Sequence, residues 1–162
     1  FIKMGMSFTE RSLANNLEVS PTAVSNSLKK LEKDNLITVD KDKESRRLSI
    51  SLNKENSYVF NLKRAENLKL LYESGLPSFL AENLPGCTII VFGSYSRGED
   101  TINSDIDIAI IGSKEKDLET IKYSKLLERP ISLNFYKDLK NVDKNLKENL
   151  CNGIVLQGAM SL

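Results

Sequence analysis

Two short apolar stretches, joined by a segment rich in Gly, Ser and charged residues, constrain the fold of this 162-residue chain more than any other feature. Residues 87–92 run directly into Gly93 and Ser94, and residues 105–111 alternate Asp or Ala with Ile. Stretches of this length and composition predict buried β-strands. Because residues i and i+2 of a strand share a face, we expect the carboxylates of Asp105 and Asp107 to lie side by side, with the intervening isoleucines in the core.

Two neighbouring carboxylates repel each other, and a bound cation removes that cost. Oxygen ligands favour Mg²⁺ or Mn²⁺, and Mg²⁺ takes its remaining ligands from water and substrate phosphates. The turn at Gly93 and Ser94 can offer backbone N–H groups and a hydroxyl to an anion, and Arg97 adds positive charge. The pattern therefore predicts a site for a metal-bound nucleoside triphosphate and in-line attack on its α-phosphate.

The string FGSYSRGEDTINSDIDIAII resembles the signature of the nucleotidyltransferase superfamily that includes DNA polymerase beta, and within it the minimal nucleotidyltransferases. The resemblance implies that Gly93, Ser94 and Arg97 bind the nucleotide, and that Asp105 and Asp107 are catalytic and hold the metal. It extends over about residues 76–158, where we expect a helix at 115–128, a strand at 131–136 and a closing segment NGIVLQG. The implied fold is α+β, with a small mixed sheet and flanking helices.

The family also uses a third carboxylate on the next strand, where this chain has Ser132 or Asn134. Neither side chain can act as a general base near pH 7. Asp138 either reaches in from the next helix or caps that helix. Triphosphate and one metal can still bind, whereas two-metal catalysis lacks one of its ligands.

The first part of the chain has the pattern of a helix-turn-helix. Residues 9–17 predict a short helix, and Ser20 followed by Pro21 is a strong start signal for a second one that ends near residue 34. Val24, Leu28 and Leu31 form the inward stripe of this second helix. Its outward row of polar residues suits contacts with bases and phosphates and consists of Thr22, Ser25, Asn26, Lys29 and Lys30.

A charged β-hairpin is expected next, from residues 36–39 and 45–52. Its tip carries four basic residues that can lie on a phosphate backbone or in a minor groove, namely Lys41, Lys43, Arg46 and Arg47. Helix, turn, helix and hairpin together resemble the winged helix of regulators of the multiple-antibiotic-resistance type. This resemblance implies binding to double-stranded DNA. The alternative is a winged helix used only for protein contacts or dimerisation.

Residues 54–74 predict a long helix with Asn53 as its N-cap. Its apolar stripe is expected to comprise Val59, Leu62, Ala65, Leu68 and either Leu71 or Tyr72. Such a helix either makes a homodimer or packs between the two halves. Gly75 and Pro77 stop it, so the expected domains are a winged helix at 1–53, a connecting helix at 54–75 and a nucleotidyltransferase domain at 76–162.

Composition excludes several kinds of chemistry. The chain has no histidine, which rules out Ser-His-Asp and Cys-His catalysis and zinc sites built on His. Its two cysteines, Cys87 and Cys151, are far apart and are expected to be small core residues in a reducing compartment. No apolar stretch approaches the roughly 20 residues of a membrane span, and the first residues lack a secretory signal pattern, so we expect a cytoplasmic protein without a membrane partner.

Charge differs between the two halves, and three functions follow from the whole pattern. Residues 1–75 hold 13 Lys or Arg against 10 Asp or Glu, and residues 76–162 hold 10 against 12, which suits a nucleic-acid-binding module joined to a metal-binding one.

The first hypothesis is an enzyme that transfers a nucleotidyl group from a triphosphate, with ATP as the expected one, to a hydroxyl of a protein, small molecule or nucleic acid. The alternative is a DNA-binding regulator whose nucleotidyltransferase fold senses a nucleotide or only mediates contacts. A third option is an antitoxin that modifies a helical toxin partner.

Overall fold

The structure is a computed structural model that describes residues 4–41, 48–140 and 142–160. Its internal contacts divide the chain into two compact units, Phe1–Asn61 and Leu62–Leu162. Helices and mixed β-sheet confirm the expected α+β class. In the part of the chain described, no helix is both long and apolar enough to span a bilayer.

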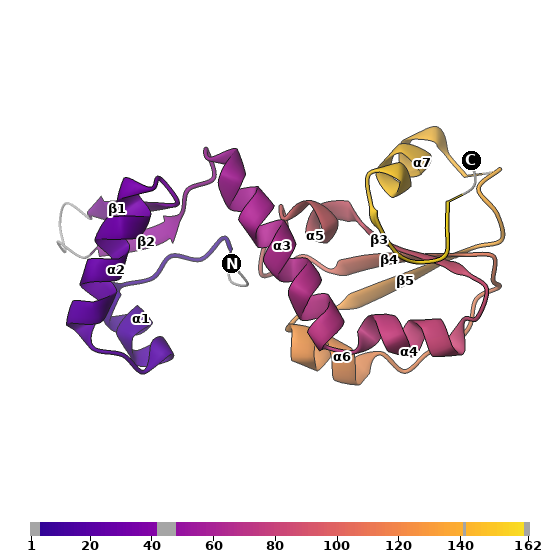
Figure 1. The fold of residues 1–162 in the computed structure, drawn as a ribbon, viewed down its shortest axis with the longest axis horizontal. Helices are drawn as coiled ribbons and strands as arrows, with labels where there is room; N and C mark the ends of the chain where they lie inside the picture. The colour runs from indigo at the N-terminus through magenta and orange to yellow at the C-terminus, as the bar shows by residue number, and fades with distance from the viewer. Residues whose placement is uncertain (1–3, 42–47, 141, 161–162) are drawn as a thin grey trace. The chain divides into compact units, whose positions relative to one another are not determined.

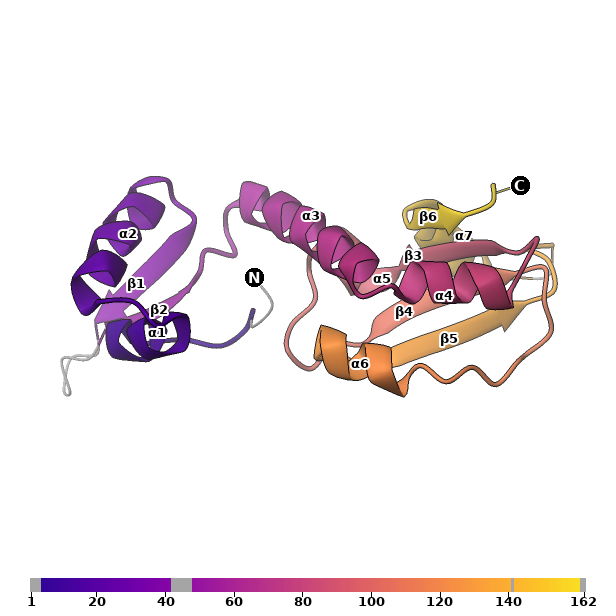
Figure 2. The same ribbon diagram turned by 60° about the horizontal axis from the view of Figure 1, so that its bottom comes forward.

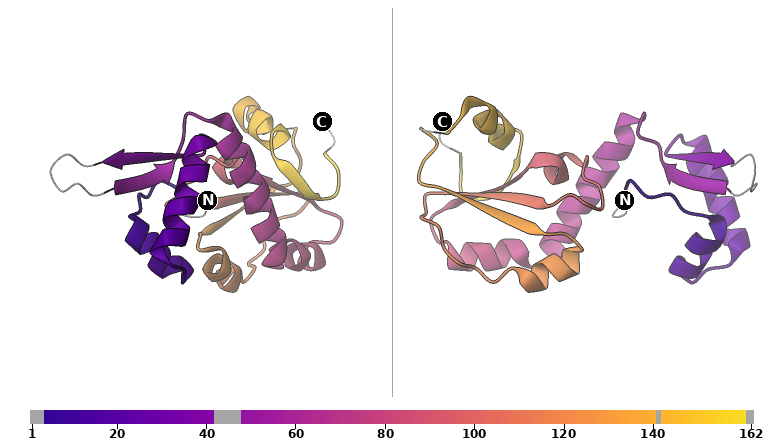
Figure 3. Two further views of the ribbon diagram at one scale, coloured as in Figure 1. Left: turned by 60° about the vertical axis from the view of Figure 1, so that its left-hand side comes forward. Right: turned by 180° about the vertical axis from the view of Figure 1, so that it is seen from behind.

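The first unit contains two helices followed by a β-hairpin, as predicted (Figure 3). The elements are α1 (Glu10–Leu17), α2 (Pro21–Lys33), β1 (Ile37–Lys41) and β2 (Leu48–Leu52). Ser20 Oγ accepts a hydrogen bond from Ala23 N at 3.2 Å, which makes Ser20 the N-cap of α2. β1 and β2 pair antiparallel, with Val39 opposite Ile50. The helices and the hairpin enclose a small apolar core of Ala14, Val24, Leu28, Ile37 and Ile50.

Leu31 does not belong to this core, contrary to the expected inward stripe of α2. Its side chain is 38% exposed. It lies at the rim of an apolar groove that Leu13, Leu17 and Leu28 also line, so no neighbouring element of this unit covers it.

The long helix α3 (Ser57–Glu73) begins three residues later than expected. Asn53 does not cap it, because the Asn53 side chain accepts from Glu55 N and donates to Asn35 O. Asn56 takes that place, with its Oδ1 accepting from Tyr58 N at 3.0 Å. The division between the two compact units falls inside α3.

The buried face of α3 is also rotated from the predicted stripe. Val59, Lys63, Asn67 and Leu71 are buried, at a regular spacing of four residues, whereas Ala65 is exposed. The prediction was correct for Val59 and for Leu71, which is buried whereas Tyr72 is exposed. It was wrong for Ala65, because it counted only apolar residues. Burial of Lys63 and Asn67 is possible because both find polar partners, which are described below.

The second unit is built on a four-stranded mixed sheet in the order β5-β4-β3-β6 (Figure 2). β4 and β5 are parallel, and the other neighbouring pairs are antiparallel. The strands are β3 (Thr88–Phe92), β4 (Ile106–Ile111), β5 (Ile131–Tyr136) and β6 (Ile154–Gln157). The helices of this unit after α3 are α4 (Leu76–Asn83), α5 (Gly93–Arg97), α6 (Ile121–Leu127) and α7 (Lys144–Cys151).

Helices cover both faces of this sheet (Figure 1). On one face, leucines of α3 and α4 and the buried residues of α6 pack on Ile106, Ile108 and Ile110 of β4. On the other face, Leu150 of α7 packs on Ile90 and other residues of a second cluster. Alternate residues of β4 therefore face opposite layers, as the strand pattern predicts.

The predicted helix at residues 115–128 is wrong in its first half, because α6 begins only at Ile121. The preceding stretch is mostly charged and offers one half-buried apolar side chain, Leu118, for packing. A helix there would bury little apolar surface, and tertiary packing supplies most helix stability.

Candidate functional site

The junction between β3 and α5 is a tightly constrained part of the second unit. Gly93 follows Phe92 with φ of +73°, a left-handed conformation that side chains disfavour. A Cβ built on Gly93 would lie 2.5 Å from Asp107 Oδ2. The backbone conformation therefore favours glycine, and a side chain at this position would displace the Asp107 carboxylate. The expected turn is here a one-turn helix that starts directly after the strand.

Asp105 and Asp107 lie at the start of β4, at the same end of the sheet as Gly93. Asp107 pairs with Phe92 of β3 and is half-buried, whereas Asp105 precedes the strand and is exposed. Burial, and secondly the charge of Asp105, raises the pKa of the Asp107 carboxyl above its ordinary value. A cation beside Asp105 and Asp107 would offset the cost of ionising the Asp107 carboxyl.

The next strand places neutral side chains beside these carboxylates. Ser132 of β5 is in register with Asp107, and Asn134 is in register with Ala109. Paired residues of neighbouring strands share a face, so Ser132 is the nearer of the two to Asp107. The Asn134 amide lies 3.4 Å from Ser132 Oγ and can donate to it. Of the two candidates for the third carboxylate position, Ser132 is the one in register with Asp107.

Asp138 does not reach this site. It follows the last residue of β5, and since β4 and β5 run parallel, it lies at the opposite end of the sheet from Asp107. Its Oδ1 accepts a hydrogen bond from Lys140 N at 2.9 Å. Both expectations for Asp138 were therefore wrong, because the next helix, α7, begins at Lys144 and has Asp143 as its N-cap.

Ser94 and Arg97 lie on α5, next to Gly93. Ser94 is half-buried. Arg97 is directed to its neighbour Glu99, with Nε donating to Glu99 Oε2 at 2.7 Å. The Arg97 charge is therefore partly compensated, and its role toward a nucleotide stays a prediction.

The donor set fits one hard cation with an incomplete protein shell. Within residues 4–41, 48–140 and 142–160, no cluster of three or more His, Cys, Asp or Glu could hold a metal. Asp105 and Asp107 supply two carboxylates, and a Mg²⁺ ion commonly completes such a shell with waters and substrate phosphates. The residues present therefore fit a metal that arrives with a phosphate ligand.

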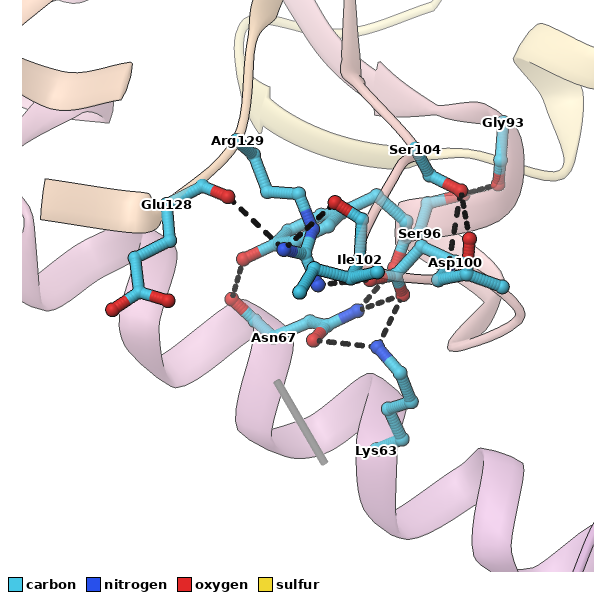
Figure 4. A network of polar contacts seen from close by, with 11 residues as sticks. Lys63, Asn67, Gly93, Ser96, Asp100, Ile102, Ser104, Glu128 and Arg129 are labelled. Atoms are coloured by element: carbon cyan, nitrogen blue, oxygen red, sulfur yellow. Dashed lines mark hydrogen bonds and ion pairs between the residues drawn. The ribbon is translucent and has the colours of Figure 1, made fainter. Parts of the chain in front are cut away.

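A buried polar network lies close to this site and was missed from the sequence (Figure 4). Its centre is Asp100, which is fully buried in the loop between α5 and β4. Asp100 Oδ1 accepts from Lys63 Nζ at 2.5 Å and from Asn67 Nδ2 at 2.7 Å. Arg129 Nη2 lies 3.6 Å from Asp100 Oδ2. The available signal was the spacing of Lys63 and Asn67 between Val59 and Leu71, which puts all four on one face of α3.

The predicted DNA-contacting residues of α2 form one polar face of that helix. Ser25 is half-buried and the others are exposed, namely Thr22, Asn26, Lys29 and Lys30. Lys41 ends β1 and is exposed. Lys43, Arg46 and Arg47 were also predicted for this footprint and lie outside the described residues.

Comparison with known protein families supports both halves of this description. Residues 74–153 match the family model described as nucleotidyltransferase domain, and residues 5–49 match the MarR family. A search of curated proteins finds no match. The family matches confirm the resemblances drawn from the sequence motifs.

Proposed function

Since the chain joins a MarR-type winged helix to a nucleotidyltransferase domain, we propose that it is a nucleotidyltransferase that also binds double-stranded DNA. Its substrate is a metal-bound nucleoside triphosphate, with ATP as the first candidate and Mg²⁺ or Mn²⁺ as the metal. The acceptor is a hydroxyl group.

The contact between Gly93 and Asp107 carries this proposal. The Asp107 carboxylate lies so close to Gly93, where the first N–H groups of α5 emerge, that a Cβ at Gly93 would displace its Oδ2. A phosphate at this backbone and a metal on Asp105 and Asp107 would be neighbours. This is the arrangement that a metal-bridged triphosphate requires.

The residues of the chain have distinct parts in the proposed reaction. Asp105 and Asp107 hold the metal, which neutralises negative charge on the phosphate oxygens when it is bound. Gly93 and Ser94 orient the triphosphate so that the acceptor oxygen attacks the α-phosphorus in line. A bond forms between that oxygen and the α-phosphorus, the α–β phosphoanhydride bond breaks, and pyrophosphate leaves. Because Ser132 cannot take up the acceptor proton, the proton passes to water and the transfer is slow.

The hydroxyl at Ser132 also favours a second candidate function. A site with two carboxylates and no base can bind a metal-bound triphosphate without turning it over. The chain would then be a DNA-binding regulator that senses the nucleotide. Binding is common to both candidates, and product formation separates them.

The product of slow hydrolysis tests the proposal without knowledge of the acceptor. When water replaces the acceptor, attack at the α-phosphorus gives AMP and pyrophosphate, whereas attack at the γ-phosphorus gives ADP and phosphate. We expect wild-type protein with ATP and Mn²⁺ to release pyrophosphate, and the Asp105→Asn, Asp107→Asn double variant to release none. ADP as the product would contradict the proposal, and binding without any product would select the sensor.

A further inference from the structure

The network around Asp100 joins three segments that carry the proposed nucleotide site (Figure 4). Asp100 lies on the loop that ends at Asp105. Lys63 and Asn67 come from α3, and Arg129 comes from the connection between α6 and β5, three residues before Ser132. A single buried carboxylate thus has partners on α3 and on the segment that leads into β5, while its own loop leads into Asp105.

The contacts between α3 and α5 are reciprocal. Asn67 Nδ2 donates to Tyr95 O at 2.9 Å, and the Tyr95 hydroxyl donates to Asn67 O at 3.0 Å. Tyr95 is buried and lies two residues after Gly93. Hence α3 fixes α5 directly and fixes the following loop through Asp100.

Hydrogen bonds within the loop and at its ends connect it to α5 and to the start of β4. Glu99 N donates to Ser94 O at 2.9 Å, and Thr101 N donates to Ser104 Oγ at 3.0 Å. Ile106 N donates to Pro130 O at 2.8 Å, next to Arg129. The loop is therefore braced at both ends, and Asp100 is its only fully buried charged residue among those described.

Burial of the charged groups around Asp100 costs desolvation free energy, and a contribution to folding stability does not by itself account for their presence. Lys63 is fully buried, and its burial lowers the pKa of its ammonium group, while the hydrogen bond to Asp100 opposes that effect. Buried ion pairs are often no more stabilising than apolar residues of the same volume. Apolar residues in the same places would pack α3 without fixing the loop to one position.

We propose that Lys63 is a positioning residue for the nucleotide site and acts through Asp100 on the loop that carries Asp105. It touches neither of the proposed metal ligands. It holds the loop so that the Asp105 and Asp107 carboxylates face the backbone at Gly93. This inference rests on the proposed function, because the site that Lys63 positions is the proposed nucleotide site.

Lys63→Met is the informative variant. Methionine keeps the side chain as far as Cε and lacks the ammonium group. Asp100 then still has Asn67 and Arg129 as partners, so it is not left as an isolated buried carboxylate. Lys69→Met is the matched control, because Lys69 lies on the same helix and its ion pair with Glu66 is exposed. Asp100→Asn is a second variant that keeps the shape of the side chain and removes the charge.

Two measurements on the full chain separate the outcomes. Amide hydrogen exchange, followed by mass spectrometry without ligand, should speed up by about tenfold or more over residues 93–105 in Lys63→Met and Asp100→Asn, with the strands unchanged and Lys69→Met like wild type. Calorimetry with ATP and Mg²⁺, at a temperature where each variant is folded, should show at least about a fivefold rise in Kd for the first two variants, which costs about 1 kcal/mol of binding free energy.

The contrary results are equally distinct. Unchanged exchange over residues 93–105, or faster exchange spread evenly over β3 and β4, would overturn the positioning role and leave Lys63 as a general structural residue. If either variant fails to fold, the other variant and the control still decide the exchange result. If wild-type protein does not bind ATP, the proposed function fails, whereas the exchange result still decides whether Lys63 holds the loop.

Discussion

At the scale of single residues, Gly93 is the position where the structure leaves least freedom. In Gly93→Ala, the left-handed backbone costs roughly 1–2 kcal/mol, and the Asp107 carboxylate must move, because its Oδ2 would lie 2.5 Å from the added Cβ. Gly86→Ala is the control, because Gly86 has a similar φ of +78° with no atom near its added Cβ. Urea unfolding should show the larger loss for Gly93→Ala, and calorimetry should show lost ATP binding in that variant alone. Equal losses in the two variants would contradict the close approach at Gly93.

Ser132 offers a gain-of-function test. Since Ser132 is in register with Asp107, Ser132→Asp places a third carboxylate beside the first two. A positioned base commonly contributes 10²-fold or more, so we expect pyrophosphate release with Mn²⁺ to rise by at least about tenfold. Asn134 lies two residues further along β5, in register with Ala109, so Asn134→Asp should have a smaller effect. A larger increase in Asn134→Asp than in Ser132→Asp would show that the register does not identify the missing ligand.

The raised pKa of Asp107 predicts a dependence of stability on pH. A carboxyl that holds its proton more tightly when folded favours folding below its ordinary pKa of 3.8, and this contribution is lost as the pH rises through the folded pKa. At pH 7 the ionised Asp107 therefore opposes folding of the metal-free protein. In EDTA, Asp107→Asn should raise the urea midpoint at pH 7 and lose that advantage near pH 3. Asp117 is exposed, so Asp117→Asn should leave the urea midpoint unchanged at both pH values. A lower urea midpoint for Asp107→Asn than for wild type at pH 7 would contradict the raised pKa of Asp107.

At the scale of elements, the strands could be predicted well because their signal is local. Alternation of Asp and Ile over residues 105–110 is enough to assign the two faces of β4, and Ser20-Pro21 is enough to start α2. The face of α3 could not be predicted, since burial of Lys63 depends on Asp100, a residue 37 positions away. The first half of the predicted helix at 115–128 was wrong for a different reason, because residues 115–120 are mostly charged and offer only Leu118 for apolar packing.

Helix α2 carries the prediction for DNA binding. Lys29 is exposed on its polar face, and each phosphate contact contributes about 0.9 to the slope of log K against log salt concentration. Lys29→Ala should therefore lower that slope by about 0.9 with any duplex DNA, measured by fluorescence anisotropy at several salt concentrations. Lys69→Ala, on α3, should leave the slope unchanged. An unchanged slope in Lys29→Ala would remove this residue from the DNA footprint.

At the scale of the whole molecule, the chain consists of two compact units with different family relationships and different chemistry. The first has the polar helix face and basic hairpin that suit phosphate contacts. The second has the paired carboxylates and the constrained glycine that suit a metal-bound phosphate. The motifs identified both units from the sequence, since each depends on residues close together in the chain. The sequence also showed that neither candidate position on the next strand is acidic. The pairing of Ser132 with Asp107 depends on strand register, and the network around Lys63 depends on tertiary contacts.

The most direct test of this account is calorimetric titration of ATP into the full chain, with Mg²⁺ and with EDTA. We expect binding that requires Mg²⁺ and disappears in the Asp105→Asn, Asp107→Asn double variant, with Asp117→Asn behaving as wild type. Binding that persists in EDTA or in the double variant would contradict the role of the two carboxylates. If neither ATP nor any other triphosphate binds at millimolar concentration, the second unit keeps the nucleotidyltransferase fold without its site.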